Sequence, residues 1–267
     1  MVIYKEKTIV DNDGFLLFLI YKIVAKYNLG CYNKIMKIYA ISDLHISTNT
    51  DKPMDVFGGN WERYLEKIFS DWQEKVSDED LVLIGGDISW AMNIEDAKQD
   101  IATLTSLKGK KVMIKGNHDY WWSAIGKVRD MLPEGFFALQ NDCVKFGNLI
   151  ICGSRCWSTP GSPDFDERDN KIYLREALRL RLSFNAVNKI REEGDKVIAL
   201  IHYPPFNVKR DNSLFTELFE DNKVDAVVYG HLHGKFVKSD KLVVKNGIKY
   251  YLTSCDQVDN KLQEIEV

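Results

Sequence analysis

Residues 36–45 read MKIYAISDLH, an apolar run that ends in an acidic residue and a histidine. The run from Lys37 to Ile41 is short and rich in Ile, Tyr and Ala, which is typical of a strand buried on both faces. Similar apolar runs, most of them bounded by Gly, Asp or Asn, follow along the chain. They predict strands over residues 37–41, 81–84, 111–114, 149–152, 197–201, 226–229 and 248–253.

The segments between these runs have helical periodicity. The predicted helices cover residues 61–76, 94–104, 171–191 and 213–219. Asn60 is the predicted N-cap of the first helix. Strands that alternate with helices predict a layered α/β domain. After Gly234 the pattern changes to antiparallel strands joined by turns, with Asn246-Gly247 as a hairpin signal.

The composition is that of an ordinary soluble globular protein. Of 267 residues, 45% are apolar and 28% are charged, so a sizeable core can form without disulfides or structural metals. The net charge of −3 argues against a protein built mainly to coat nucleic acid or an anionic membrane, although it permits a local basic groove. The five cysteines are odd in number and irregularly spaced, which predicts reduced thiols in a cytoplasmic protein.

Residues 1–35 precede the first predicted strand. Their apolar run, FLLFLIY at 15–21, is far shorter than the roughly 20 residues of a membrane-spanning helix, and its flanks do not fit a signal peptide. We predict that residues 1–35 are an N-terminal extension that the chemistry does not need, and that residues 36–267 form one domain. A short packing helix and a weak membrane-surface anchor are the alternatives for the extension.

The histidines share one kind of position. Each of the five lies just past the carboxyl end of a predicted strand, the edge at which layered α/β sheets bind ligands. They are His45, His118, His202, His231 and His233. Oxygen ligands accompany them at the same edge, namely Asp43, Asp87 and Asn117. This segregation is not expected of histidines that merely pack in a core or decorate a surface.

The spacing of these residues favours a metal centre. Asp43 and His45 are two residues apart, so in an extended chain their side chains point the same way. Glycines before Asp87, Asn117 and His231 let the backbone turn sharply and approach a charged centre. Mixed imidazole and carboxylate ligands suit Zn, Mn or Fe. The set is larger than one tetrahedral ion needs, so two ions that share one carboxylate fit it better.

These motifs occur in a recognisable order. D-x-H, G-D, G-N-H-D, a lone His and G-H-x-H follow one another from Met36 to at least Cys255. In this order the chain resembles the calcineurin-like metallophosphoesterase superfamily, and within it the bacterial predicted phosphohydrolases. The resemblance implies a single domain with a four-layer αββα sandwich, in which helices flank two mixed β-sheets.

The resemblance also implies a role for each residue of the edge. Two divalent ions (Mn, Fe or Zn) would each have a ligand set. The first set is Asp43, His45 and His233. The second set is Asn117, His202 and His231. Asp87 would bridge the two ions.

The implied reaction is hydrolysis of a phosphomonoester or phosphodiester. A hydroxide that bridges the metals would attack phosphorus in line, while His118 assists the leaving group. Asp119 would orient or charge-tune the His118 imidazole, and the alternative for Asp119 is a helix N-cap. The substrate would be a small-molecule or nucleotide-like phosphoester, and the sequence leaves the oligomeric state open.

Three weaker candidates lie near these motifs. The aromatic run Tyr120-Trp121-Trp122 could stack a nucleobase, although core packing is the more usual role. Arg155, in a turn-rich loop after the fourth predicted strand, could clamp a phosphate oxygen, or it could be a solvated or capping residue. The arginines of the predicted helix 171–191 favour a solvated face, because Glu176 and two other glutamates dilute their charge.

The residues within the individual motifs distinguish the alternative functions. Protein Ser/Thr phosphatases of the superfamily usually extend the second motif to GDxVDRG and end the third as GNHE, whereas this chain has GDISWA and GNHD. A nuclease would require a basic rim near the loop around Arg155. A non-catalytic interaction scaffold of the same fold would have lost ligands or the histidine over the substrate, and this chain retains them all.

Overall fold

The computed structural model describes residues 36–48, 52, 54–163, 165–234, 237 and 239–267. Residues 36–267 form one compact unit. The predictions about residues 1–35, including the apolar run at 15–21, fall outside the described residues. Within the described ranges, no helix combines the length and the apolar character that crossing a membrane requires.

The described strands form two mixed sheets. The first has the order β11 (Gln263–Glu264), β1 (Ile38–Ile41), β2 (Leu81–Ile84), β3 (Lys110–Ile114) and β4 (Phe136–Leu139). The second has the order β5 (Asp142–Phe146), β6 (Leu149–Ser154), β7 (Lys196–Ile201), β8 (Ala226–Tyr229), β10 (Ile248–Leu252) and β9 (Leu242–Lys245). Neighbouring inner strands are parallel, and the antiparallel strands β11, β5 and β9 lie at sheet edges.

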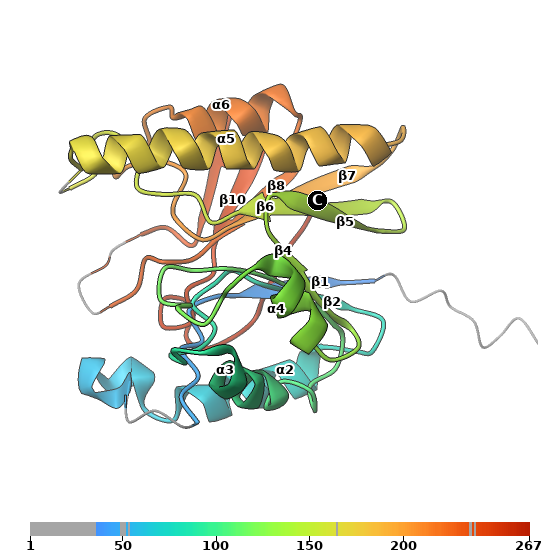
Figure 1. Ribbon diagram of the computed structural model, residues 1–267, viewed down its shortest axis with the longest axis vertical. Coiled ribbons are helices and arrows are strands. Elements are labelled where there is room, and N and C mark those ends of the chain that lie inside the picture. Colours follow the sequence, from blue (N-terminus) through green and yellow to red (C-terminus); the bar gives the residue numbers. More distant parts are fainter. Residues whose placement is uncertain (1–35, 49–51, 53, 164, 235–236, 238) are drawn as a thin grey trace, which may run out of the picture. The chain divides into compact units, whose positions relative to one another are not determined.

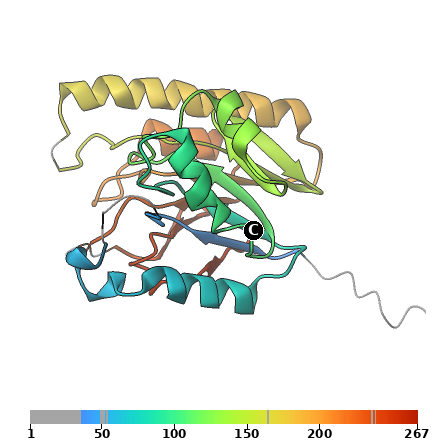
Figure 2. The ribbon, with the colours of Figure 1, turned by 60° about the horizontal axis from the view of Figure 1, so that its bottom comes forward.

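Helices cover the outer face of each sheet (Figure 1). On the first sheet lie α2 (Tyr64–Lys75), α3 (Ile94–Ala102) and α4 (Ile125–Met131), preceded by short 3₁₀ turns at Met54–Phe57 and Gly59–Trp61. On the second sheet lie α5 (Glu167–Ile190) and α6 (Leu214–Asp221). Figure 2 shows α2 and α5 on opposite outer surfaces with both sheets between them. The four-layer sandwich that the resemblance implied is therefore confirmed.

Strand β2 shows why the layers form. Its four residues are buried, and alternate side chains of a strand point to opposite faces. Leu81 and Leu83 join the apolar core between the sheets, together with Ile198 of β7. Val82 and Ile84 join a second core beneath the helices of the first sheet. A third core lies between the second sheet and its helices α5 and α6.

Several element boundaries differ from the sequence prediction. The predicted N-cap Asn60 is wrong, because α2 begins at Tyr64 behind Arg63 and the chain around Asn60 forms a 3₁₀ turn instead. Helix α5 begins at Glu167, earlier than predicted, because the Asp166 carboxylate accepts from the backbone N–H groups of Arg168 and Asp169 in a capping box. The hairpin at Asn246-Gly247 is confirmed, and both of its residues have positive φ.

Candidate metal centre

The predicted site residues lie in loops at the carboxyl ends of five strands. The loop after β1 carries Asp43 and His45, and the loop after β2 carries Asp87. Asn117, His118 and Asp119 follow β3, His202 follows β7, and His231 and His233 follow β8. The two sheets meet at this edge, where Ser42 N–H donates to Thr253 O at 2.8 Å. The fold thereby brings residues from both halves of the chain to one place.

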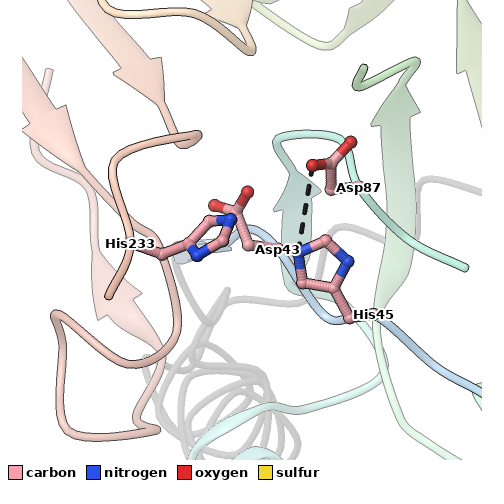
Figure 3. A group of neighbouring side chains, drawn as sticks. All are labelled: Asp43, His45, Asp87 and His233. Carbon is pink, nitrogen blue, oxygen red and sulfur yellow. Dashed lines mark ion pairs between the residues drawn. The ribbon is translucent and has the colours of Figure 1, made fainter. Parts of the chain in front are cut away.

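One group of side chains comes from loops of both sheets. Asp43, His45, Asp87 and His233 each offer one ligand atom, and these atoms lie within 4.8 Å of one another (Figure 3). The dashed line in Figure 3 joins His45 Nε2 to Asp87 Oδ2, which are 3.9 Å apart. Asp43, His45 and Asp87 are buried, and His233 is partly exposed. This group could hold a metal ion.

A second group surrounds the side-chain oxygen of Asn117. Its Oδ1 lies 2.7 Å from His202 Nε2 and 2.9 Å from His231 Nδ1. The Asp87 carboxylate is close to this group as well, with Oδ2 3.6 Å from His202 Nε2. Asp87 therefore stands between the two groups, and all seven residues predicted as ligands lie together.

The backbone at these residues is not extended. Asp43, His45, Asp87 and His231 have φ angles of 58°, 45°, 51° and 68°, in the left-handed region that non-glycine residues rarely adopt. The expectation of an extended Asp43–His45 pair is therefore wrong, and tight turns aim these side chains instead. Such strain costs free energy and persists where the surrounding structure imposes it, typically at functional sites.

Close backbone approach explains two glycines of the motifs. A Cβ atom on Gly116 would lie 2.1 Å from Asp87 Oδ1. A Cβ atom on Gly230 would lie 2.6 Å from Asp43 Oδ2. Only glycine leaves these two carboxylates room, as the sequence analysis expected of the glycines at the turns.

The donor atoms fit divalent metal ions. Both ring nitrogens of His45 and Oδ2 of Asp87 are buried without a hydrogen-bond partner, which is costly unless a ligand satisfies them. Burial lowers the pKa of His202 to about 3 and that of His231 to about 2, so both imidazoles are neutral and keep a lone pair for a metal. Burial likewise raises the pKa of Asp87 to about 6, because removal from water disfavours the charged carboxylate.

Adding Mn²⁺ to the metal-free protein is therefore expected to raise its melting temperature. At about 100 times the dissociation constant, binding contributes about 2.7 kcal/mol, or roughly 5 °C or more for a domain of this size. In the metal-free protein, the stability contributed by Asp87 is present below its ordinary pKa of 3.8 and is lost as the pH rises through about 6. Thermal melts should show the Mn²⁺ effect shrinking below that pH, because the ion must then displace a proton.

Sodium chloride at matched ionic strength is the control for this measurement. It should leave the melting temperature unchanged, since only a specific ligand binds the folded state selectively. An equal Mn²⁺ effect at pH 5 and pH 7.5 would contradict the assignment of buried carboxylates as ligands.

His118 lies over the first group without belonging to it. Its backbone N–H donates to Asp87 Oδ1 at 2.7 Å. Its ring is half-buried, with its centroid 4.6 Å from that of Trp90 and 5.7 Å from that of His45. Burial lowers the pKa of His118, and its Nδ1 is buried without a hydrogen-bond partner. The imidazole is thus held beside the candidate metal centre by its backbone and by ring contacts.

Asp119 makes hydrogen bonds to two neighbouring loops. Its carboxylate accepts from the backbone N–H groups of Ile88, Ser89 and Gly116 at 2.9, 3.2 and 2.7 Å, and from Trp121 Nε1 at 3.0 Å. It does not hydrogen-bond to the unpartnered Nδ1 of His118, and charge tuning of that imidazole by Asp119 stays a prediction. Asp119 instead ties the loop after β2 to the loop after β3.

Replacing Asp119 with Ala should destabilise the fold by at least about 3 kcal/mol, because several buried donors lose their acceptor and each costs about 1–3 kcal/mol. Urea unfolding measures this change in the free energy of unfolding. Asp130→Ala, at an exposed position of α4, is the matched control and should change stability little. A similar, small effect of both substitutions would show that Asp119 does not hold the two loops.

The three residues of the aromatic run 120–122 differ in their exposure. Trp121 and Trp122 are 2% and 3% exposed and pack in the core, so neither can stack a nucleobase. Tyr120 is 54% exposed. Trp90 was not among the predicted site residues, and its ring stacks on His45 at a centroid distance of 4.7 Å. Its place directly after Gly-Asp-Ile-Ser was the available signal.

Arg155 lies beside the second group. Its carbonyl oxygen accepts from His202 N–H at 3.2 Å, and its guanidinium lies 4.7 Å above the ring of Trp157. The loop that Arg155 begins also borders a cavity of about 730 Å³ next to His231. Ser158 and Leu232 line this cavity, which offers space for an organic group beside the metal centre.

Two mixed sheets under flanking helices, with a His- and Asp-lined centre at their carboxyl edge, define a metal-binding α/β sandwich. The chain belongs to the calcineurin-like phosphoesterases, whose family model matches residues 36–235. The family and the geometry of the first group together support the binding of divalent metal.

Relatives agree with this membership. Proteins named "Uncharacterized metallophosphoesterase" from Helicobacter pylori strains 26695 and J99 are each 24% identical over 215 residues, covering 80% of this chain and 48% of their own length. The chain thus spans about half the length of these curated relatives. The crystal structure of TT1561 of Thermus thermophilus shares the fold, with a TM-score of 0.55 and 12% identity over 86% of this chain and 98% of that one.

Proposed function

We propose that this protein is a metal-dependent phosphohydrolase that cleaves phosphomonoester or phosphodiester bonds with two divalent ions. The observation that carries the proposal is the position of Asp87, whose Oδ2 lies 3.9 Å from His45 Nε2 in one group and 3.6 Å from His202 Nε2 in the other. One carboxylate between two sets of neutral imidazoles is the arrangement that two ions sharing a ligand require. Mn²⁺, Fe²⁺ and Zn²⁺ suit these donors.

Each set of side chains has a distinct task in this proposal. Asp43, His45 and His233 hold one ion, and Asn117, His202 and His231 hold the other. When bound, the two ions neutralise phosphate oxygens and lower the pKa of water, which supplies a nucleophile near neutral pH. His118 supplies a proton to the oxygen of the departing alcohol. Arg155 contacts a phosphate oxygen of the substrate.

The substrate that we propose is a small-molecule or nucleotide-like phosphoester. The cavity beside His231 offers room for its organic part. The protein-phosphatase alternative is weaker because its extended second motif is missing, and the scaffold alternative is weaker because the ligand groups are retained. We further propose a cytoplasmic enzyme that uses manganese.

Purified protein loaded with Mn²⁺ tests the proposal. It should hydrolyse 4-nitrophenyl phosphate or bis(4-nitrophenyl) phosphate and carry close to two metal ions per chain by elemental analysis. Dialysis against a chelator should abolish the activity, and Mn²⁺ should restore it. A metal-free protein that is fully active would overturn the proposal.

A further inference from the structure

A buried glutamate beside the metal centre holds three arginines. Glu176 of α5 is 1% exposed. Its Oε1 lies 2.6 Å from Arg179 Nη1, 3.3 Å from Arg175 Nη2 and 3.5 Å from Arg155 Nη2. Within the described ranges, Glu176 is the acid in every ion pair of these arginines. Glu176 was predicted to dilute the charge of a solvated basic face, whereas the fold buries it and directs the arginines toward it.

These arginines carry more charge than Glu176 neutralises. One carboxylate faces three guanidinium groups, so a positive surplus remains. We call Arg155, Arg175 and Arg179 the basic cluster.

The basic cluster adjoins the metal centre through Arg155. Arg155 accepts through its carbonyl from the backbone of His202. Ring contacts also connect the Arg155 guanidinium to a proposed ligand. It lies 4.7 Å from the centroid of Trp157, the Trp157 and Tyr203 centroids are 4.7 Å apart, and those of Tyr203 and His231 are 4.0 Å apart. The cluster therefore lies beside the second metal-ligand group.

We infer that the basic cluster is a second anion subsite, so that the natural substrate carries a further phosphate group besides the one that is cleaved. This inference rests on the proposed function and specifies its substrate class. Guanidinium forks bind phosphate oxygens in pairs, and a fixed fork loses little freedom when it does so. Glu176 is the positioning residue, because it holds like-charged groups together that would otherwise separate.

The size of the cluster favours a small molecule over a nucleic acid. A polynucleotide is bound along its backbone through many phosphate contacts, commonly about 6–10 for a duplex-binding protein. Here three cations surround one carboxylate, and the chain as a whole has a net charge of −3. The basic rim expected of a nuclease is thus a compact patch that matches one additional phosphate.

Two nucleotides that differ by one phosphate test the inference. Adenosine 5′-monophosphate and adenosine 3′,5′-bisphosphate are compared as substrates of the Mn²⁺-loaded protein, with phosphate release and product chromatography as readouts. We expect kcat/KM to favour the bisphosphate by about tenfold or more, since a charge-assisted hydrogen bond contributes about 1.5–3 kcal/mol. Equilibrium binding of the same pair by calorimetry gives the comparison without turnover.

Substitutions in α5 test whether the basic cluster causes the preference for the bisphosphate. Arg179→Gln should bring the ratio of the two nucleotides close to one, and Arg179→Lys should give an intermediate ratio because it keeps the charge without the fork. The Arg179 side chain is 44% exposed, so both variants should fold. Arg181→Gln, an exposed arginine of the same helix outside the cluster, is the matched control and should keep the wild-type ratio.

Three outcomes would overturn the inference. The first is a wild-type ratio near one in both catalysis and binding. The second is an equal ratio in Arg179→Gln and Arg181→Gln. The third is an Arg179-dependent preference for a single-stranded oligonucleotide over both nucleotides, which would assign the cluster to nucleic acid. Failure of the proposed function differs from all three, because the protein would then hydrolyse no phosphoester while calorimetry still reports the nucleotide preference.

Discussion

Replacing Asp87 with Asn is expected to empty the metal centre and to lower kcat/KM for 4-nitrophenyl phosphate by about 10³-fold or more. Asp87 Oδ2 is buried without a hydrogen-bond partner and faces an imidazole of each ligand group. An amide has nearly the same shape but no negative charge, so it cannot balance two cations. Each factor of ten corresponds to about 1.4 kcal/mol, and a metal ion supplies several kcal/mol of charge stabilisation.

Elemental analysis of Asp87→Asn should show less than one metal ion per chain, against about two in the wild type. Asp225→Asn is the matched control, since Asp225 lies at the amino end of β8 and accepts from Val197 N–H far from the proposed ligands. That variant should keep its metal and its activity. Full metal content in Asp87→Asn would show that Asp87 does not bridge the two ions.

The layered core could be predicted because its strands are buried on both faces and therefore read as continuous apolar runs. β2 and β8 have the predicted bounds, and the other inner strands differ by one or two residues at their ends. The missed strands β4, β5 and β11 lie at sheet edges, and β4 was missed although its residues FFAL are apolar. β5 alternates apolar and polar residues at a sheet edge, and β11 has only two residues. The seven-residue helix α4 was missed because Ala124 provides no side-chain cap.

The metal centre could be anticipated because its residues occupy one kind of position in the sequence, the end of a buried strand. The hydrogen-bond and ion-pair partners around the centre could not be anticipated, because they depend on contacts between distant segments. Asp119 reaches Ile88 and Ser89, about 30 positions earlier, and no local pattern indicates that contact. Glu176 looks like an ordinary surface residue among arginines, and its burial follows only from how α5 packs on the second sheet.

The charge distribution around the metal centre likewise could not be predicted from composition. The net charge of −3 describes the whole chain, and it disfavours an extended nucleic-acid surface. It does not reveal that three buried carboxylates, Asp43, Asp87 and Asp119, lie close together, where burial raises the pKa of each. Nor does it reveal the basic cluster beside them. This distribution of charge fits the proposed metal ions at the carboxylates and the inferred anion subsite beside them.

Replacing His118 with Ala is expected to leave the metal content intact and to lower the rate by about 10²–10⁴-fold, the usual contribution of a positioned general acid. The His118 ring is held beside Trp90 and His45, and the connection to Asp87 runs through its backbone N–H, which alanine retains. His233→Ala provides the contrast, because His233 belongs to the first ligand group and its loss should release metal.

The leaving group distinguishes proton donation by His118 from a merely structural effect of the substitution. 4-Nitrophenolate departs without help, whereas an alkoxide needs a proton as the bond to phosphorus breaks. The loss of rate in His118→Ala should therefore be larger for an alkyl phosphate such as glycerol phosphate than for 4-nitrophenyl phosphate. Equal losses for both substrates would indicate that His118 stabilises charge on the phosphate rather than on the departing oxygen. Loss of a metal ion would place His118 among the ligands and would refute its proposed role.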